Sequence, residues 1–527
     1  MKESETKVRQ LLIGEALKYA AHSSPNRSAF VFENKRLSYK QLLNRAQLLA
    51  GWLTETGISK GDKIGCLFKN GLSFVEVYFG ASLSGGVLVP VNFRLVPNEV
   101  EYILDHADVK ILFVEEDLLS SIEPIVNKLK KIEQIVVVGE VYPILNKEVL
   151  SYETIFPMNI KGEAEELCDD DAHAIIYTSG TTGKPKGAVL THKNIYINGM
   201  NKSYHGQSKR GAKHLLIPPL FHVAALSLLV TNCLLEGTMV IHREFNPEKV
   251  WQTIENEKIN SMFLVPAMWN MLFQVRNYEK YALDSMTSCS TGGAICPLEL
   301  KKKIMSTFKN AGLHEAFGQT EMSPSTTYLS GEESIKEGKA ASVGRPSLNV
   351  RIRIVDEYMN DVPAGEVGEI LYQGPTMMKE YYKNPEATSE AFKGGWFHSG
   401  DLVRMDEDGY IYVIDRKKDM IISGGENIYP KELEEVLYTH PYILDAAVIG
   451  VPDAKWGETV KACIVLKEDK QLSKEEVLEF CQTRIASYKK PRLIEFLEAL
   501  PRNASGKVLK TVLKSQVFTE KSEGRIE

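Results

Sequence analysis

The sequence predicts an α/β protein with a large N-terminal body and a small C-terminal α+β domain. Apolar, strand-like runs alternate with amphipathic helical patterns through the first part of the 527-residue chain. After about residue 340 the pattern changes to short strands separated by proline and glycine, and from about residue 416 helices and strands are mixed again. Alternating strands and helices favour mainly parallel sheets covered by helices, whereas short strands joined by turns favour antiparallel sheets.

The body begins with a well-marked helix. Leucine and alanine recur at helical spacing over 41–54, where Ser38 can cap the helix and Gly57 can end it. The further predicted elements are strands over 63–68, 87–91 and 109–114, helices over 74–83, 99–105 and 247–257, and a strand over 262–265. Their order predicts repeated strand–helix units and therefore a mainly parallel sheet.

The remainder is predicted as an antiparallel, barrel-like part of the body followed by the small domain. Strands are expected over 350–355 and 368–372. The C-terminal domain should hold a helix over 430–437, strands over 446–451 and 460–466, and a helix opened by the capping box Ser473…Glu476. The charged stretch 415–419 is the linker candidate, so we place the body at 1–416 and the domain at 417–527.

Composition and charge exclude several classes of protein. The chain has 63 Lys and Arg against 69 Asp and Glu, a net charge of −6, which disfavours nucleic acid or an anionic membrane as the main partner. The seven cysteines show no C-x-x-C spacing, the N-terminus lacks the pattern of a signal peptide, and the longest apolar stretch, 223–235, is too short to span a bilayer. We therefore expect a cytoplasmic protein with small-molecule partners and no integral membrane segment; the sequence leaves monomer and homodimer open.

A loop rich in glycine, hydroxyl groups and lysine follows the apolar strand 174–176. Glycine lets backbone N–H groups turn toward one point, hydroxyls donate to phosphate oxygens and lysine supplies positive charge, so the loop predicts a polyphosphate site. It is not a Walker A loop, because Pro185 stands where Ser or Thr is required. An ordinary surface loop has the same composition, so the loop alone leaves both interpretations open. The candidate phosphate-binding residues are Thr178, Ser179, Gly180, Thr181, Thr182, Gly183, Lys184 and Lys186.

This loop resembles the phosphate-binding signature of the adenylate-forming (AMP-binding) superfamily, which includes acyl-CoA synthetases, firefly luciferase and the adenylation domains of nonribosomal peptide synthetases. Further motifs of that family follow in its order, from Ser38 to Lys507. The chain is most like an acyl-CoA synthetase or fatty-acid CoA ligase. The resemblance implies ATP, Mg²⁺ and coenzyme A as cofactors and co-substrates, and a C-terminal domain that is mobile between the two half-reactions.

Two motifs resemble the nucleotide site of the family. The segment 290–294, Ser-Thr-Gly-Gly-Ala, resembles the one whose backbone lines adenine, and this implies contacts by Gly293 and Ala294. In the segment 316–321, Ala-Phe-Gly-Gln-Thr-Glu, the resemblance implies that Phe317 stacks on the base beside Gly318 and that Thr320 binds the α-phosphate. It also implies that Glu321, with Thr178, holds Mg²⁺, for which oxygen ligands are suited. Without the resemblance, Phe317 would be a core aromatic and Glu321 a surface charge.

The ribose and catalytic motifs follow. In the segment 396–401, Asp401 matches the carboxylate that binds both ribose hydroxyls, with Arg416 as the second contact, while His398 is expected to be an exposed loop residue. The segment 501–507 resembles the closing motif, which makes Lys507 the catalytic lysine. A carboxylate must approach the α-phosphate of ATP, and two like charges at ~4 Å in an effective dielectric of ~20 repel by about 4 kcal/mol, so one ammonium matters.

The hinge and thiol site are assigned by the same resemblance. Lys418 occupies the hinge position, where many relatives have Asp. The segment 423–427 would be the strand edge that approaches the pantetheine arm, since the adjacent Gly424 and Gly425 permit close approach of a ligand. Lys489, in the basic run 488–492, is the candidate for the CoA phosphates, although such a run is usually only a solvated surface.

The acid site is predicted at Phe221-His222-Val223. Amino-acid-activating relatives place Asp here to pair with the α-ammonium, whereas His222 resembles the gate of fatty and aromatic acyl-CoA synthetases. An apolar tunnel, or ordinary core, is suggested by Val223, Ala224, Ala225 and Leu226 together with Val265 and Met268. Gly293 and Gly318 are further candidates for binding the substrate. We therefore predict an ATP-dependent acyl-CoA ligase that activates an apolar acid, with a medium- or long-chain fatty acid favoured.

Three alternatives stay open beside this prediction: an aryl-acid CoA ligase, an adenylating enzyme that delivers to a separate carrier protein, and a nucleotide-binding protein without catalysis. The complete set of candidate residues argues against the last, because a degenerate member should first lose the lysine or an acidic residue.

Overall fold

The computed structural model describes residues 11–141, 149–157, 166–178, 184–206, 208–424, 426–453, 455–482, 484–502 and 508–515. The chain forms two compact units. The first is Met1–Ile352 with Tyr372–Phe397, and the second is Arg353–Leu371 with His398–Glu527. The second unit therefore holds more than residues 417–527, and a domain boundary at Lys418 stays a prediction. In the described residues, every helix is too short or too polar to cross a membrane.

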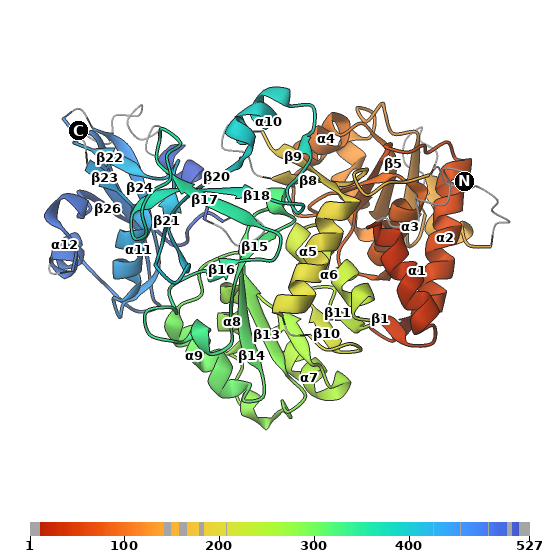
Figure 1. Ribbon diagram of the computed structural model, residues 1–527, viewed down its shortest axis with the longest axis horizontal. Coiled ribbons are helices and arrows are strands. Elements are labelled where there is room, and N and C mark those ends of the chain that lie inside the picture. Colours follow the sequence, from red (N-terminus) through yellow and green to blue (C-terminus); the bar gives the residue numbers. More distant parts are fainter. Residues whose placement is uncertain are drawn as a thin grey trace. The chain divides into compact units, whose positions relative to one another are not determined.

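A nine-stranded sheet lies at the centre of the first unit, with strand order β16-β15-β14-β13-β12-β10-β11-β1-β2 (Figure 1). The strands from β14 to β1 in this order are parallel, and the strands beyond them at both edges are antiparallel. Their bounds are β1 Ser28–Phe32, β2 Lys35–Ser38, β10 Lys213–Leu216, β11 Thr238–Ile241, β12 Ser261–Phe263, β13 Ser288–Gly292, β14 Gly312–Gly318, β15 Ser325–Ser330 and β16 Arg345–Pro346.

Helices cover both faces of this sheet. On one face α7 (Pro247–Glu257), α8 (Pro266–Leu272) and α9 (Leu298–Thr307) enclose an apolar core that includes Trp251, Trp269 and Leu313. Figure 1 shows α5 (His192–His205) and α6 (Val223–Leu234) on the other side of the sheet from α8 and α9. The predicted strand 262–265 is wrong at its C-terminal end, because Pro266 is the first residue of α8 and Val265 is its N-cap.

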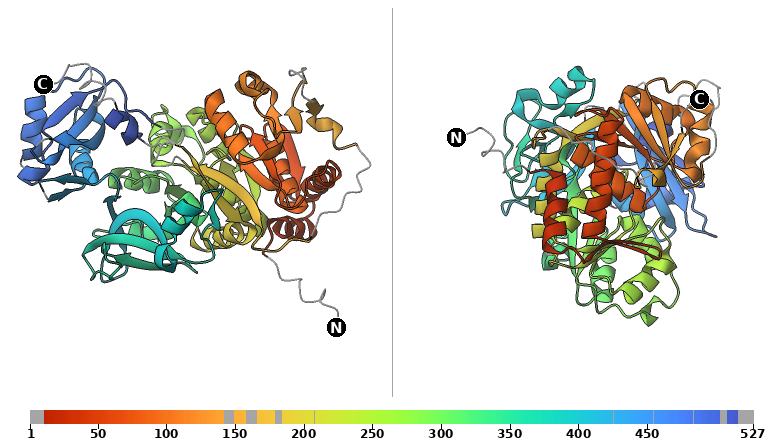
Figure 2. Two further views of the ribbon diagram at one scale, coloured as in Figure 1. Left: turned by 90° about the horizontal axis from the view of Figure 1, so that it is seen from above. Right: turned by 90° about the vertical axis from the view of Figure 1, so that its right-hand side faces the viewer.

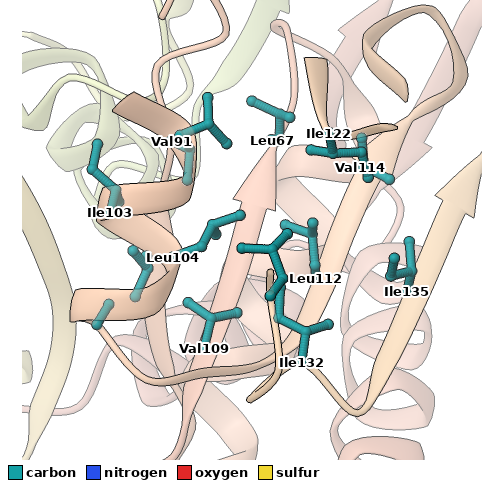
Figure 3. Packing of buried hydrophobic residues seen from close by; sticks show 14 of the residues in the cluster. Leu67, Val91, Ile103, Leu104, Val109, Leu112, Val114, Ile122, Ile132 and Ile135 are labelled. Atoms are coloured by element: carbon teal, nitrogen blue, oxygen red, sulfur yellow. The ribbon is translucent and has the colours of Figure 1, made fainter. Parts of the chain in front are cut away.

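An eight-stranded sheet completes the first unit, with order β19-β9-β8-β4-β3-β5-β6-β7. Figure 3 shows part of its core, where Leu67, Leu112 and Val114 of the strands meet Ile103 and Leu104 of α4 (Pro97–His106). The bounds are β3 Lys63–Leu67, β4 Val87–Pro90, β5 Val109–Glu115, β6 Gln134–Val138, β7 Val149–Ser151, β8 Ala172–Thr178, β9 Lys186–Thr191 and β19 Glu380–Tyr381.

The remaining helices of this unit are α1 Ile13–Ser23, α2 Tyr39–Glu55, α3 Leu72–Ser84, α4 Pro97–His106 and α10 Pro385–Ala391. Helices α1, α2 and α3 pack together, and red helices of this group run side by side in the right-hand view of Figure 2. The predicted cap of α2 is confirmed, because the Ser38 hydroxyl accepts from the Gln41 N–H and the Gln41 side chain accepts from the Ser38 N–H.

The second unit contains two sheets. The four-stranded sheet has the order β17-β18-β20-β21, and in the other sheet β23, β22, β25 and β24 are neighbours while β26 pairs with β25. The bounds are β17 Arg351–Val355, β18 Val367–Gln373, β20 Phe397–Met405, β21 Ile411–Arg416, β22 Ile421–Ser423, β23 Glu426–Ile428, β24 Ile443–Asp453, β25 Gly457–Leu466, β26 Leu493–Phe496, α11 Pro430–Tyr438 and α12 Lys474–Gln482. The capping box of Ser473 and Glu476 is confirmed.

Short 3-10 helices span Glu116–Ser121, Glu123–Ile125, Tyr152–Thr154, Tyr278–Lys280, Thr320–Met322, Gly331–Ser334, Lys393–Gly395 and Ser487–Lys489. The predicted α/β class is thus confirmed, with mainly parallel, helix-covered sheets in the first unit and mainly antiparallel pairing in the second.

Candidate active site

The candidate phosphate loop connects two paired strands. Thr178 ends β8, Lys186 begins β9, and the two residues are register partners, with the Thr178 hydroxyl donating to the Lys186 carbonyl at 3.4 Å. Lys184 is exposed and Lys186 is half-buried. The predicted residues Ser179, Gly180, Thr181, Thr182 and Gly183 lie outside the described residues.

Helix α4 holds the chain on both sides of this loop. The Tyr177 hydroxyl lies 2.7 Å from Nδ1 of His106, and the Tyr102 hydroxyl donates to the Pro185 carbonyl at 3.2 Å. Burial raises the pKa of Tyr177, so the phenol keeps its proton, and burial lowers the pKa of His106. One helix therefore fixes the two ends of the candidate phosphate site.

The candidate adenine segments lie at the carboxyl ends of two neighbouring parallel strands. Gly292 of β13 pairs with Ala316 of β14, so the segment 292–294 and Phe317 come to the same edge of the sheet. A Cβ atom at Gly292 would lie 2.5 Å from the Ala316 carbonyl oxygen. Gly318 has φ +153°, and its Cβ would lie 2.0 Å from the Pro324 oxygen. Only glycine fits these two positions. Both lie at the carboxyl-terminal edge of the parallel strands, where open α/β sheets bind their ligands.

Glu321 is a buried carboxylate without a cationic partner in the described part of the chain. Its residue is 8% exposed, and Oε1 accepts a hydrogen bond of 2.8 Å from the hydroxyl of Tyr381. Lys186 lies over the Tyr381 ring at 5.1 Å, which places this pair beside the end of the phosphate loop. A buried carboxylate needs compensation, and a hard cation supplies it, so Glu321 fits the predicted Mg²⁺ ligand.

The described residues contain no cluster of three or more His, Cys, Asp or Glu suited to a metal. Mg²⁺ commonly binds through one or two carboxylates and the phosphates of a substrate, so a single protein carboxylate agrees with such a site. Thr320 precedes Glu321 in the same 3-10 turn and is half-buried.

His222 is the N-cap of α6, and its ring packs against Phe221 with centroids 4.3 Å apart. Burial, and then the nearby Arg94, lower the pKa of His222 to about 4, so the ring is neutral at pH 7. Its buried Nε2 has no hydrogen-bond partner among the described residues. Val265 lies beside the other candidate segment, because a Cβ at Gly293 would be 3.6 Å from Val265 Cγ1.

In the second unit, Asp401 and Arg416 are register partners on β20 and β21. Asp401 is 2% exposed, and Arg416 Nε lies 2.7 Å from its Oδ1. The structure therefore brings the two predicted ribose residues together as an ion pair. The expectation that His398 lies in an exposed loop is wrong. His398 is half-buried in β20, and its Nδ1 lies 3.5 Å from a Glu369 carboxylate oxygen. Glu369 also accepts from Lys417 Nζ at 2.9 Å.

The hinge and thiol-site candidates lie farther along this unit. Lys418 follows β21 and is exposed. Gly424 has φ +62°, its N–H donates to the Trp456 carbonyl at 2.8 Å, and a Cβ there would lie 2.6 Å from the Trp456 ring. Lys489 is bound by both oxygens of Glu432 at 2.7 and 2.8 Å, so its charge is already compensated. Gly425 and Lys507 lie outside the described residues.

The sequence did not reveal the side chains that hold the candidate site residues in place. Tyr381 holds Glu321 from 60 residues away, and Tyr102 and His106 hold the loop from more than 70 residues away. No local pattern marks these residues, because a tyrosine or histidine on an amphipathic element has the same sequence signal whether it packs or binds.

Comparison with known proteins supplies a family. The AMP-binding enzyme family matches residues 17–382, and the AMP-binding enzyme C-terminal domain matches residues 432–507. A feruloyl-CoA synthase of Amycolatopsis sp is 35% identical over 492 residues, 93% of this chain and 96% of that protein. A long-chain-fatty-acid–CoA ligase of Mycobacterium tuberculosis is 36% identical over 508 residues, which cover 96% of this chain and 98% of that protein.

The fold is likewise similar to solved structures. The o-succinylbenzoate CoA synthetase of Bacillus subtilis, in complex with its acyl-adenylate intermediate, superposes with a TM-score of 0.84 at 29% identity, over 95% of this chain and 97% of that one.

Proposed function

Because the chain belongs to the AMP-binding enzyme family and is an ATP-dependent, AMP-forming acid–CoA ligase, we propose that it activates a largely apolar carboxylic acid without an α-ammonium group. The observation that carries this proposal is the neutral His222 at the start of α6, between the buried Phe221 and Val223. A substrate ammonium there would lack the carboxylate that amino-acid-activating relatives provide, and an uncompensated buried charge is costly.

The reaction has two steps. The acid's carboxylate oxygen attacks the α-phosphorus of ATP, the bond to pyrophosphate breaks, and acyl-AMP forms; the CoA thiol then attacks the acyl carbon, loses its proton and displaces AMP. Bound Mg²⁺ would neutralise phosphate charge. We propose that Glu321, held by Tyr381, is its protein ligand, with Thr178 as a second.

The remaining residues position and stabilise the reactants. We propose that Phe317, Gly293 and Ala294 bind adenine, that Lys184, Lys186 and Thr320 bind phosphates, and that Lys507 offsets the repulsion between the two reacting anions. The ion pair with Arg416 supports ribose binding by Asp401, because it holds that carboxylate in a fixed orientation.

For the second step we propose that the glycine turn at Gly424 admits the pantetheine arm, after the C-terminal domain turns at Lys418. The absence of a side chain beside the Trp456 ring supports this role. Lys489 stays a weaker candidate for the CoA phosphates, since Glu432 already binds it. We also propose a cytoplasmic location, from the charge balance and cysteine pattern.

Two classes of acid remain candidates. A medium- or long-chain fatty acid follows from the apolar residues near His222, and an aryl acid is the second class because a feruloyl-CoA synthase is 35% identical. The test is acid-dependent release of AMP with CoA, measured across saturated fatty acids, aryl acids and amino acids. Turnover of amino acids alone would overturn the proposed class, and thioester formation only on an added carrier protein would overturn the acceptor.

A further inference from the structure

The two faces of the nine-stranded sheet have different chemistry. Residues two apart on a strand share a face, so Leu313 and Cys289 lie on the face packed against Trp251 and Trp269. On β13 and β14 the opposite face, toward α5 and α6, carries small and polar side chains instead. On β14 and β13 these are Gly312, His314, Ala316 and Gly318, and their partners Ser288, Ser290 and Gly292. A parallel sheet buried on both faces is normally rich in Val, Ile and Leu, so this face departs from ordinary core.

Lys202 of α5 is directed into this region. Its ammonium donates to the Ser227 hydroxyl at 2.6 Å and to the Ala224 carbonyl at 3.0 Å, both on α6. No carboxylate pairs with it in the described part of the chain. Burial lowers its pKa to about 7, yet the residue keeps some accessible surface. That combination is expected for a side chain that borders an internal space.

Several polar atoms near Lys202 or near its helix neighbour His205 are buried and lack a partner among the described residues. His314 is 4% exposed with Nδ1 unpartnered, and Tyr328 is 9% exposed with its hydroxyl unpartnered. The His205 ring, one turn of helix from Lys202, stacks on Tyr328 at 4.3 Å, and its Nε2 is also unpartnered. The same holds for Nε2 of His214, whose pKa Lys202 helps to lower. Buried polar groups are almost always hydrogen-bonded, so this concentration of them indicates a missing polar partner.

The cluster formed by Lys202, His205, His214, His314 and Tyr328 lies at a short distance from the acid site. Ser227, which binds Lys202, follows His222 by five residues on α6, ~7.5 Å at the helical rise. His314 precedes Gly318 by four residues on the same face of β14, ~13 Å along a strand. A group about 8–13 Å from the reacting carboxylate would therefore reach the cluster.

We infer that Lys202 and the surrounding histidines and tyrosine bind a second oxygen acceptor at the far end of the acid, and that the enzyme selects acids bearing such an oxygen. This inference rests on the proposed function, since it concerns the acid site of that reaction. The acceptor is a ring hydroxyl or a second carboxylate: Lys202 donates a charged hydrogen bond, and Tyr328 and the histidines supply further donors. Aryl acids with a ring oxygen and oxygenated medium-chain acids have the required length.

The test compares matched acids with and without the distal oxygen: 4-hydroxycinnamate against cinnamate, and decanedioate against decanoate. For the wild-type enzyme we expect kcat/KM to be ~10–100-fold higher for at least one oxygenated acid than for its analogue, the value of one charged hydrogen bond. Comparing the two pairs distinguishes a hydroxyl from a carboxylate. The inference would be overturned if kcat/KM for both apolar analogues equalled or exceeded kcat/KM for their oxygenated counterparts. This comparison uses only the wild-type enzyme.

The variant arm uses Lys202→Met, which keeps the length of the side chain and removes its charge. We expect it to lose most of the preference through a raised KM for the oxygenated acid, while turnover of the apolar analogue is kept or increased. Lys193→Met is the matched control, because Lys193 is on the same helix but pairs with Asp170. An unchanged preference in Lys202→Met, or an equal loss on both acids, would refute the role of Lys202. If no acid in either pair or in the fatty-acid panel released AMP, the proposed function itself would fail, and the inference with it.

Discussion

The hydrogen bond between Tyr381 and Glu321 gives a sharp test of the nucleotide site. Tyr381→Phe removes one hydroxyl and keeps the ring that Lys186 packs against. The lost bond joins a neutral donor to a carboxylate that is 8% exposed and has no cationic partner in the described residues. Bonds to charged groups contribute about 1.5–3 kcal/mol, which corresponds to ~10–100-fold in an equilibrium or rate constant.

We expect the lower end of that range, because water can reach a carboxylate that loses its phenol. In acid-dependent exchange of pyrophosphate into ATP, Tyr381→Phe should therefore lower kcat/KM for ATP ~10-fold, and half-maximal activity should require more Mg²⁺. The Mg²⁺ shift is specific, since a merely structural effect would reduce activity at every Mg²⁺ concentration alike.

Tyr382→Phe is the matched control. Tyr382 is the next residue, but its hydroxyl donates to Asp108 at 2.9 Å and does not contact Glu321. We expect its exchange rate and Mg²⁺ dependence to stay near wild type. Equal behaviour of the two variants, or an unchanged Mg²⁺ requirement in Tyr381→Phe, would refute the assignment of Glu321 as the supported metal ligand.

Three further predictions concern separate parts of the molecule. Lys507→Ala should slow adenylate formation ~10²–10³-fold while thioester formation from preformed acyl-adenylate continues, and unchanged pyrophosphate exchange would contradict this. Gly424→Leu should spare that exchange but block thioester formation, because its Cβ would lie 2.6 Å from the Trp456 ring; survival of both half-reactions would exclude the thiol site there. Lys202→Met should stabilise the protein at pH 7 and by less at pH 10, as measured by urea unfolding. Burial places the Lys202 pKa at about 7 against an ordinary 10.5, so the folded lysine is penalised below pH 7 and the penalty is relieved between the two values. The difference between the two pH values should be about 2–4 kcal/mol, and a stabilisation that does not fall with pH would contradict the assigned burial.

Local patterns predicted the elements of the first unit well. The helix expected over 41–54 is α2, because its apolar spacing and the Ser38 cap are both encoded within a few residues. The strand order could not be predicted in the same way. β1 pairs with β11, more than 200 residues away, and no local signal specifies that register.

The same distinction between local patterns and contacts of distant residues applies to the candidate site. Contiguous motifs, such as those holding Gly292 and Gly318, could be proposed from the sequence through their resemblance to a family, and the structure shows that the backbone at Ala316 and Pro324 leaves no room for a Cβ atom at either glycine. The supporting contacts could not, since Tyr381 reaches Glu321 only through the pairing of β19 with β9. Lys202 carried no signal either: a lysine on a helix is usually a surface charge, and its burial follows from the packing of α5 against α6.

The unequal faces of the nine-stranded sheet bear on how such an enzyme can change over evolutionary time. Side chains on the face of Trp251 and Trp269 interlock, so a substitution there disturbs its neighbours and loses stability. On the other face of β10, β13 and β14, His214, Ser290 and His314 present polar side chains. Substitutions at these three positions leave the apolar cluster itself unchanged, so a library there would test whether this face sets the choice of acid.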